Sequence, residues 1–113
     1  MEMQIDKLDK ISIARIVGSL DGVTSIEAQE KLMPLVQAKC CLALDLSKCN
    51  YISSAGLRLL MMLAKQVNAQ GGRLALSGVC AEVKDVMDIT GFINFFKLYD
   101  TIDEIISAMR KEQ

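Results

Sequence analysis

With 113 residues, 51% of them hydrophobic and 4% aromatic, the chain is expected to form one domain with an aliphatic core. Its formal net charge is −1, and it has neither a basic cluster nor aromatic residues placed for base stacking, which disfavours nucleic-acid binding. No apolar run is long enough to span a bilayer, and the acidic start lacks a signal-peptide pattern, so we expect a cytoplasmic protein without membrane contact.

The chain contains no histidine, which excludes imidazole acid–base catalysis, a phosphohistidine relay and most zinc sites. It also lacks a glycine-rich phosphate loop of known spacing and a clustered carboxylate pair, so we expect no enzyme activity, no metal and no cofactor. The four cysteines form no Cys-x-x-C pair; they are Cys40, Cys41, Cys49 and Cys80. We interpret them as small buried hydrophobes in a reducing cytosol, with a redox or metal role as the alternative. Adjacent Cys40 and Cys41 should face opposite sides of a strand.

The chain opens with a predicted antiparallel strand pair. Residues 3–8 form the first strand, Asp9-Lys10 the turn, and residues 11–16 a half-buried second strand in which apolar residues alternate with period two. Residues 18–22 are expected to form a loop.

A helix is then predicted over residues 24–39, with Thr24 and Glu27 as a capping box. Pro34 should kink or divide it, because proline lacks a backbone N–H. The almost wholly apolar run 40–46 is typical of a strand buried on both faces.

In the second half of the chain, the sequence pattern predicts helices and strands in alternation. A helix over 54–70 ends at Gly71-Gly72, and the strand 73–77 follows, so this strand should lie parallel to the run 40–46 through a right-handed crossover.

A short helix is predicted over residues 81–90, and it should end at Gly91. Residues 95–98 are predicted to form a short strand at the edge of the sheet. A final helix is predicted over 101–111, with Thr101 and Glu104 as its capping box. The chain is therefore predicted to be a single α/β domain, with a mixed four- to five-stranded sheet and about four helices.

The helix over 54–70 has one broad apolar face, which we expect to be core: Leu57, Leu60, Met61, Ala64 and Val67. Leu59 and Met62 fall outside this face. They either pack beneath neighbouring loops or form an apolar docking strip, a role for which methionine is well suited. Ser54 and Arg58 are one turn apart and can approach each other.

The most informative motif is Tyr51-Ile52-Ser53-Ser54-Ala55-Gly56-Leu57, where a short polar loop leads into this helix. Serine is a favoured N-cap residue, so capping alone would explain the pair of serines. The same place suits a covalently attached phosphate, because the first N–H groups of a helix are unpaired and partly positive. Nothing nearby could activate a serine as a nucleophile.

In this context, residues 44–58 resemble the signature of STAS domains, and in particular of bacterial anti-sigma factor antagonists. Their pattern is a strand ending in Asp-Leu-Ser or Asp-Phe-Ser, a short loop and an aromatic or apolar pair. Asp or Ser then follows, with Ser, a small residue (Ser, Thr or Ala), Gly and Leu after it. Three further segments resemble landmarks of the same family in the same order: residues 18–24, 71–74 and 89–92. The resemblance covers essentially the whole chain, so we expect residues 1–113 to form one STAS domain.

The resemblance implies a partner switch. The unphosphorylated antagonist binds an anti-sigma factor that is also a serine kinase of the GHKL ATPase type, and thereby frees its target. Phosphorylation of the antagonist then dissociates the complex, and a metal-dependent serine phosphatase reverses the modification. Alignment on Gly56-Leu57 places the phosphoacceptor at Ser54, with Ser53 as the alternative.

The resemblance, with the helix geometry above, also implies a partner-binding set: Asp21, Gly22, Thr24, Ser53, Ala55, Gly56, Arg58 and Met62. Two positions depart from the family pattern, because Ser53 and Ser19 stand where many members carry acidic residues. The alternative function is an accessory STAS subunit of a lipid-transporter ATPase.

Overall fold

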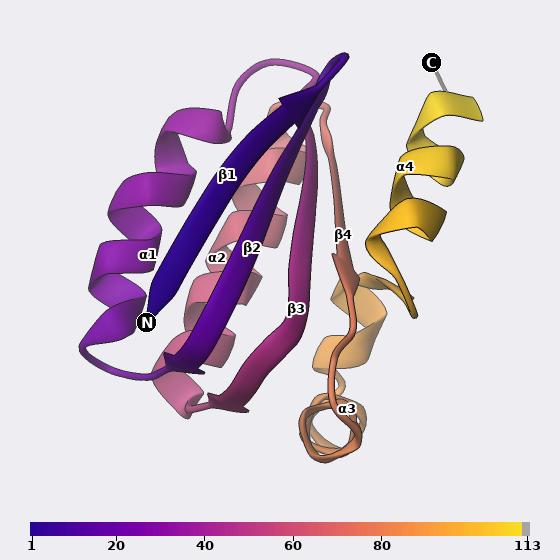
Figure 1. The fold of residues 1–113 in the computed structure, drawn as a ribbon. Coiled ribbons are helices and arrows are strands. Elements are labelled where there is room, and N and C mark those ends of the chain that lie inside the picture. The colour runs from indigo at the N-terminus through magenta and orange to yellow at the C-terminus, as the bar shows by residue number, and fades with distance from the viewer. Residues whose placement is uncertain (112–113) are drawn as a thin grey trace.

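The computed structural model describes residues 1–111, and after an initial pair of strands its helices and strands alternate along the chain (Figure 1). The strands are β1 (Glu2–Leu8), β2 (Ile11–Leu20), β3 (Cys41–Ile52), β4 (Arg73–Ser77) and β5 (Lys97–Tyr99). The helices are α1 (Thr24–Leu32), α2 (Ser54–Ala69), α3 (Ala81–Thr90) and α4 (Ile102–Lys111), with short 3-10 segments η1 (Met33–Leu35) and η2 (Phe92–Phe95).

The five strands lie in one sheet in the order β1-β2-β3-β4-β5. Strand β1 runs antiparallel to β2, and the pairs β2–β3, β3–β4 and β4–β5 are parallel. The predicted antiparallel pair, the parallel crossover around α2 and the mixed α/β sheet are therefore confirmed. Within residues 1–111, the sheet has five strands and is accompanied by four α-helices.

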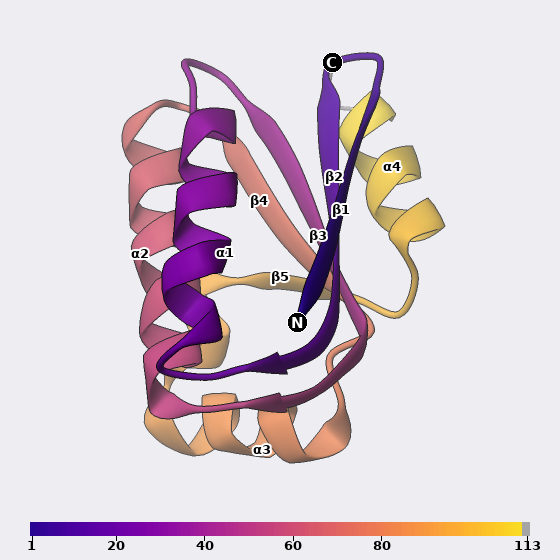
Figure 2. The ribbon, with the colours of Figure 1, turned by 60° about the vertical axis from the view of Figure 1, so that its left-hand side comes forward.

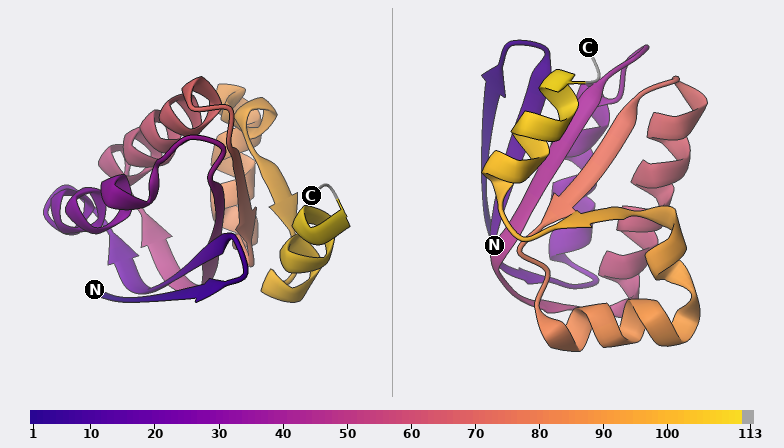
Figure 3. Two further views of the ribbon diagram at one scale, coloured as in Figure 1. Left: turned by 90° about the horizontal axis from the view of Figure 1, so that it is seen from above. Right: turned by 90° about the vertical axis from the view of Figure 1, so that its right-hand side faces the viewer.

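Helices cover both faces of this sheet. Helices α1 and α2 pack on one face, α4 lies on the other, and α3 lies below one end (Figures 2 and 3). Alternate side chains of β3 therefore enter different cores: Leu42 and Leu44 join the cluster under α1 and α2, whereas Cys41 and Ala43 pack with Ile105 of α4. This burial on both faces explains why the β3 sequence is nearly continuous in apolar residues.

Two predicted loops are partly strand. Strand β2 continues to Leu20 and β3 to Ile52, where residues 18–22 and the polar stretch after Leu46 were expected to be irregular. The pairing of β2 with β3 shifts register between Arg15 and Val17 and again between Gly18 and Ser19. Such irregularities bend strands, and both strands curve toward the helices at their carboxyl ends (Figure 2). The bent ends of β2 and β3 carry exposed polar residues, so their sequence lacks the apolar pattern by which a strand is recognised.

The predicted helix over 24–39 is too long. Helix α1 ends at Leu32 and η1 follows, with Pro34 in its first turn. Proline cannot donate the backbone hydrogen bond that an α-helix needs there, so the expected division at Pro34 is confirmed. Helix α3 has the predicted bounds and ends at Gly91, whose φ of 79° is left-handed. At α4, the N–H of Glu104 donates to Thr101 Oγ1 at 3.2 Å, as the capping box requires.

Candidate functional site

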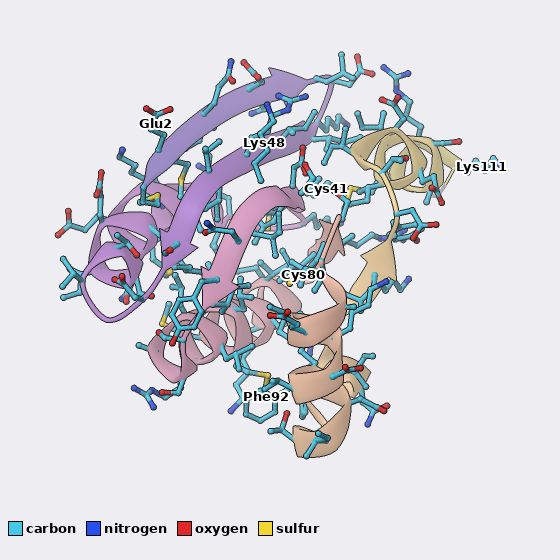
Figure 4. The ribbon with its side chains drawn as sticks, turned by 60° about the horizontal axis from the view of Figure 1, so that its bottom comes forward. Glu2, Cys41, Lys48, Cys80, Phe92 and Lys111 are labelled. Atoms are coloured by element: carbon cyan, nitrogen blue, oxygen red, sulfur yellow. The ribbon has the colours of Figure 1, made fainter. Side chains whose placement is uncertain are left out.

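Two loops meet where the parallel strands β2 and β3 end. Leu20 and Ile52 are paired at the last position of both strands, and the backbone N–H of Ser53 donates to the carbonyl oxygen of Leu20 at 2.9 Å. The loop that carries Asp21 and the turn that carries Ser54 are thus joined by a backbone hydrogen bond. Figure 4 turns this end of the molecule toward the viewer, with Cys80 at the start of α3 beside it.

Gly56 allows this close junction. A Cβ added at Gly56 would lie 2.6 Å from the carbonyl oxygen of Leu20 and 2.8 Å from Cγ2 of Ile52. Both distances are shorter than van der Waals contact, and the nearer atom belongs to the backbone, which cannot rotate away. Gly56 is buried, so its contribution to the site is to let α2 begin against the end of β2.

The two serines have different roles at the start of α2. Ser53 is the N-cap residue, half-buried and with extended backbone, and its Oγ accepts a hydrogen bond from the N–H of Gly56 at 3.3 Å. Ser54 is the first helical residue and is exposed. Of the two serines, Ser53 is therefore the one that caps the helix. Within residues 1–111 the Ser54 hydroxyl makes no hydrogen bond, so it is the more accessible of the pair.

The start of α2 is electrostatically suited to an anion. Its first turn contains no acidic residue, and the first N–H groups of a helix carry partial positive charge. Arg58 is exposed one turn further along the same helix. A phosphate on Ser54 would therefore lie near backbone donors and within reach of a guanidinium group.

Asp21 caps α1 in partnership with Thr24. Asp21 Oδ1 accepts hydrogen bonds from the backbone N–H groups of Val23 and Thr24, both at 3.0 Å. In return, Thr24 Oγ1 accepts from the N–H of Asp21 at 2.8 Å. This reciprocal pair is a capping box, three residues earlier than the predicted pair of Thr24 and Glu27. The predicted pair does not form, because Thr24 is the first helical residue and its hydroxyl bonds the backbone of Asp21 and Ser19. Glu27 pairs instead with Lys31 at 3.1 Å.

The same hydrogen bonds affect the charge of Asp21. The backbone N–H groups of Thr24 and then Val23, followed by the Thr24 hydroxyl, stabilise its carboxylate and lower its pKa below the ordinary value of 3.8. Asp21 is therefore ionised at neutral pH. Its Oδ2 makes no hydrogen bond within the described residues and remains free to meet a partner.

The predicted docking strip on α2 is only partly present. Leu59 is 5% exposed and belongs to the main core, so of its two predicted roles the packing alternative is confirmed and the docking alternative is wrong. Met62 is half-buried and packs against the same core. Helix α2 contacts α1 and η2 as well as β3 and β4, so its buried face is wider than a single sheet-facing stripe. Helical periodicity alone could not show these lateral neighbours.

Sequence reasoning missed an exposed apolar frame around this site, formed by Val23, Ile26 and Tyr51. Their side chains are 80%, 63% and 55% exposed, respectively. Tyr51 is paired with Ser19 near the ends of β3 and β2, and Val23 and Ile26 lie at the start of α1. The available signal was the position of Ile26 off the apolar face that carries Ala28 and Leu32. Large exposed apolar side chains at one end of a domain indicate a contact surface.

Within residues 1–111, no three histidine, cysteine, aspartate or glutamate side chains are placed to hold a metal ion. In the same part of the chain, every helix is too short or too polar to cross a membrane.

The fold and this site together define a small α/β domain with a mixed sheet and one exposed serine at the start of its central helix. The chain belongs to the STAS domain family, whose family model matches residues 2–105.

The relatives that it matches are named as anti-sigma factor antagonists. The chain is 30% identical over 111 residues to BtrV of Bordetella bronchiseptica, a candidate anti-sigma factor antagonist, with 97% of this chain and 96% of that protein covered. It superposes on the crystal structure of a candidate anti-sigma factor antagonist from Thermotoga maritima with a TM-score of 0.87 and 23% identity, covering 96% and 94% of the two chains.

The fold also matches SpoIIAA of Bacillus in two states. The TM-score is 0.76 for its unphosphorylated form, at 17% identity and with 96% of this chain and 98% of that chain covered. It is 0.75 for the phosphorylated form, at 16% identity and with 96% and 99% covered.

Proposed function

We propose that this protein is an anti-sigma factor antagonist whose partner binding is switched by phosphorylation of Ser54. The observation that carries the proposal is the exposed hydroxyl of Ser54 at the first position of α2, next to a neighbour, Ser53, whose hydroxyl is used as the helix cap. The relationship to BtrV over nearly the full length of both chains supports the antagonist function. The existence of SpoIIAA in a phosphorylated form supports modification as the switch.

In the unmodified state, the proposed contact surface combines the apolar frame of Val23, Ile26 and Tyr51 with the charge of Asp21 and Arg58. The ionised Asp21 offers Oδ2 to a partner cation, and the frame supplies apolar area to be buried. Gly22, Thr24, Ser53, Ala55 and Met62 complete the proposed partner-binding set. Gly56 acts in this set only by positioning α2, because it is buried.

Phosphorylation would change this surface without refolding the domain. In the reaction, Ser54 Oγ forms a bond to the γ-phosphorus of ATP, the bond to the β-phosphate oxygen breaks, ADP leaves, and the hydroxyl proton passes to a base of the kinase. The product carries about −1.5 to −2 charges at neutral pH. The amides at the start of α2 and Arg58 can hold this charge on the domain, but burying it in an apolar interface is costly.

The proposed partners follow from this chemistry. We infer that the anti-sigma factor is also the serine kinase and is of the GHKL ATPase type, and that a metal-dependent serine phosphatase restores the unmodified form. We propose that these reactions occur in the cytoplasm, where ATP is present, and that residues 1–113 act as one STAS domain.

The proposal is tested by affinity capture from native cell extract with the wild-type protein, Ser54→Asp and Ser107→Asp as baits. Ser107 is also exposed but lies on α4, on the other face of the sheet, so its variant adds the same charge away from the site. We expect wild type and Ser107→Asp to capture an ATP-binding serine kinase, and Ser54→Asp to lose it. Capture of a transporter ATPase subunit by all three baits would instead favour the transporter alternative.

A further inference from the structure

Two of the four free thiols lie where the end of β3 meets the start of α3. Cys49 is in the last part of β3, and Cys80 is the residue that precedes α3 (Figure 4). Cys49 is 4% exposed and belongs to the core cluster under α1 and α2, and Cys80 is half-buried and packs against the same cluster. The switch proposed at Ser54 uses neither sulfur atom, so the pair is open to a role of its own.

The pairing of β3 with β4 brings these two residues together. The strands run parallel, and close contact continues past the end of their ladder. A Cβ added at Gly78 would lie 2.7 Å from the Cβ of Ser47 and 2.8 Å from its Cα, so the two backbones touch there. Cys49 and Cys80 each lie two residues beyond this contact, and both pack in the same core cluster. They are therefore neighbours across the two chain segments.

The electrostatics of Cys49 agree with this placement. Burial is the main cause that raises the pKa of the Cys49 thiol, and a charge on Cys80 raises it further. Repulsion between two groups weakens with distance, so this effect requires Cys80 to lie near Cys49. The other two cysteines are remote: Cys41 is eight residues before Cys49 on β3, or roughly 26 Å along an extended strand at ~3.3 Å per residue. Cys49 and Cys80 are thus the pair that the fold places together.

We propose that Cys49 and Cys80 form a reversible disulfide when the protein meets a peroxide, and that this bond ties the end of β3 to the start of α3. Disulfides of cytosolic proteins are usually transient and redox-sensing rather than structural, which fits a pair of free thiols beside a functional surface. Formation of the bond requires no partner protein, so it can be tested independently of the switch at Ser54.

Cys80 is the thiol that reacts first, because it is the more exposed of the two. Its thiolate attacks one oxygen of hydrogen peroxide, an S–O bond forms, the O–O bond breaks, and the departing hydroxide takes up the thiol proton as water. The Cys49 sulfur then attacks the sulfenic sulfur of Cys80, an S–S bond forms, the S–O bond breaks, and the hydroxide leaves with the Cys49 proton as a second water. The two thiols have together lost two electrons, and the peroxide has been reduced to water.

The disulfide would change the backbone that leads to Ser54. The Cys49 thiol donates a hydrogen bond to the carbonyl oxygen of Tyr51, with a distance of 3.6 Å between sulfur and oxygen. A disulfide sulfur has no hydrogen to donate, so oxidation would remove this bond. Tyr51 belongs to the exposed apolar frame and lies two residues before the Ser53 cap. Oxidation would therefore alter the strand end that carries part of the proposed contact surface.

The test treats the whole folded protein with an equimolar amount of hydrogen peroxide, blocks the remaining thiols with N-ethylmaleimide, and maps the linkage by non-reducing trypsin digestion and mass spectrometry. Trypsin cuts after lysine and arginine, so the cysteines fall on three peptides: 40–48, 49–58 and 74–84. We expect 49–58 to be linked to 74–84 and 40–48 to be recovered with both thiols blocked. Dithiothreitol should separate the linked peptides. Neither of them contains methionine, so methionine oxidation does not obscure the result.

Three variants identify the role of each sulfur. Cys80→Ala should abolish the linked peptide. Cys49→Ala should stop at the sulfenic acid of Cys80, which dimedone traps. Cys40→Ala is the matched control, because Cys40 is also half-buried but precedes the opposite end of β3, and its yield of linked peptide should equal that of wild type. Circular dichroism before oxidation verifies that each variant is folded.

The wild-type protein alone can overturn the proposal. Recovery of 49–58 and 74–84 only with blocked thiols would do so, as would a link to 40–48 in the folded protein or a disulfide-linked dimer on a non-reducing gel. In urea the same treatment should give mixed links, and an unchanged yield of the link between 49–58 and 74–84 would show that the fold does not place the pair. Amide chemical shifts give a second measurement: Tyr51 and Ser53 should shift on oxidation of wild type and stay unchanged in Cys80→Ala.

Discussion

Leu20 and Ser53 are joined by a backbone hydrogen bond of 2.9 Å, which makes the end of β2 and the start of α2 one rigid junction. The capped turn of Asp21 follows one side of this junction and Ser54 follows the other. A partner that contacts both loops therefore meets a preformed surface. A phosphate on Ser54 would then alter binding through its charge and size rather than through a change of fold.

The first prediction concerns Gly56. Gly56→Ala should lower the free energy of unfolding by about 1–3 kcal/mol, the usual cost of overpacking, because its Cβ would overlap the Leu20 carbonyl. Denaturant titration measures this cost. Gly22→Ala is the matched control, since an added Cβ there meets no atom within 4 Å, and its stability should change little or rise slightly. Equal midpoints for the two variants would contradict the packing role of Gly56.

The second prediction separates the two serines by stability. Ser53→Ala should cost about 0.5–2 kcal/mol, because the helix loses the side chain that accepts the Gly56 N–H. Ser54→Ala should stay within about 0.5 kcal/mol of wild type, since its hydroxyl is exposed at the first helical position. Thermal melts and urea titration provide the comparison. The reverse order would show that Ser54, rather than Ser53, stabilises the start of α2.

The third prediction separates the serines by modification. Incubation with the captured kinase and ATP, followed by peptide mass spectrometry, should place phosphate on Ser54 in the wild type. Ser53→Ala should still be phosphorylated, and Ser54→Ala should not. Phosphate found on Ser53 in the wild type, with Ser54 unmodified, would contradict the assignment.

The fourth prediction concerns the charge at Ser54. Ser54→Asp should weaken the partner complex at least about tenfold, or ~1.4 kcal/mol, whereas Ser54→Ala should retain wild-type affinity. The physical reason is the cost of bringing a carboxylate into an interface framed by Val23, Ile26 and Tyr51. Calorimetric titration with the purified partner decides the matter. Matching affinities for the two variants would argue against charge as the switch.

The fifth prediction is a pH dependence set by Asp21. Its pKa is lower in the folded than in the unfolded state, so the unfolded chain binds more protons between the two values and stability rises with pH there. Its contribution is present above about 3.8 and is lost as pH falls through the folded-state pKa. Asp21→Asn keeps a capping oxygen without the charge. Urea midpoints should therefore differ between wild type and variant at pH 7 and converge in strong acid; a pH-independent difference would exclude the charge as its source.

Several features of this fold could be derived from local sequence. The antiparallel pair β1–β2, the bounds of β4 and α3, the end of α3 at Gly91 and the cap of α4 by Thr101 all depend on residues close together in the chain. Turn residues, capping residues and the alternation of apolar with polar side chains each depend on only a few neighbouring positions. They can therefore be recognised in the sequence without a structure. The two adjacent serines before Gly56 likewise marked the start of α2.

Tertiary contacts decided the remaining features. Leu59 is buried because α2 has neighbours on three sides, and the strands β2 and β3 are longer than their apolar runs because they bend together under the helices. Asp21, rather than Thr24, caps α1 because the chain leaves β2 in a turn that brings the Val23 and Thr24 N–H groups to its carboxylate.

The division of roles between Ser53 and Ser54 has the same origin. Either serine could cap a helix according to its type alone, and the sequence determined only that a helix begins at this pair. The hydrogen bond from Ser53 to Leu20 and the tight fit of Gly56 against the same carbonyl set the residue at which α2 starts. That starting point leaves the Ser53 hydroxyl bonded to the helix and the Ser54 hydroxyl exposed, because consecutive residues at a helix start point in different directions.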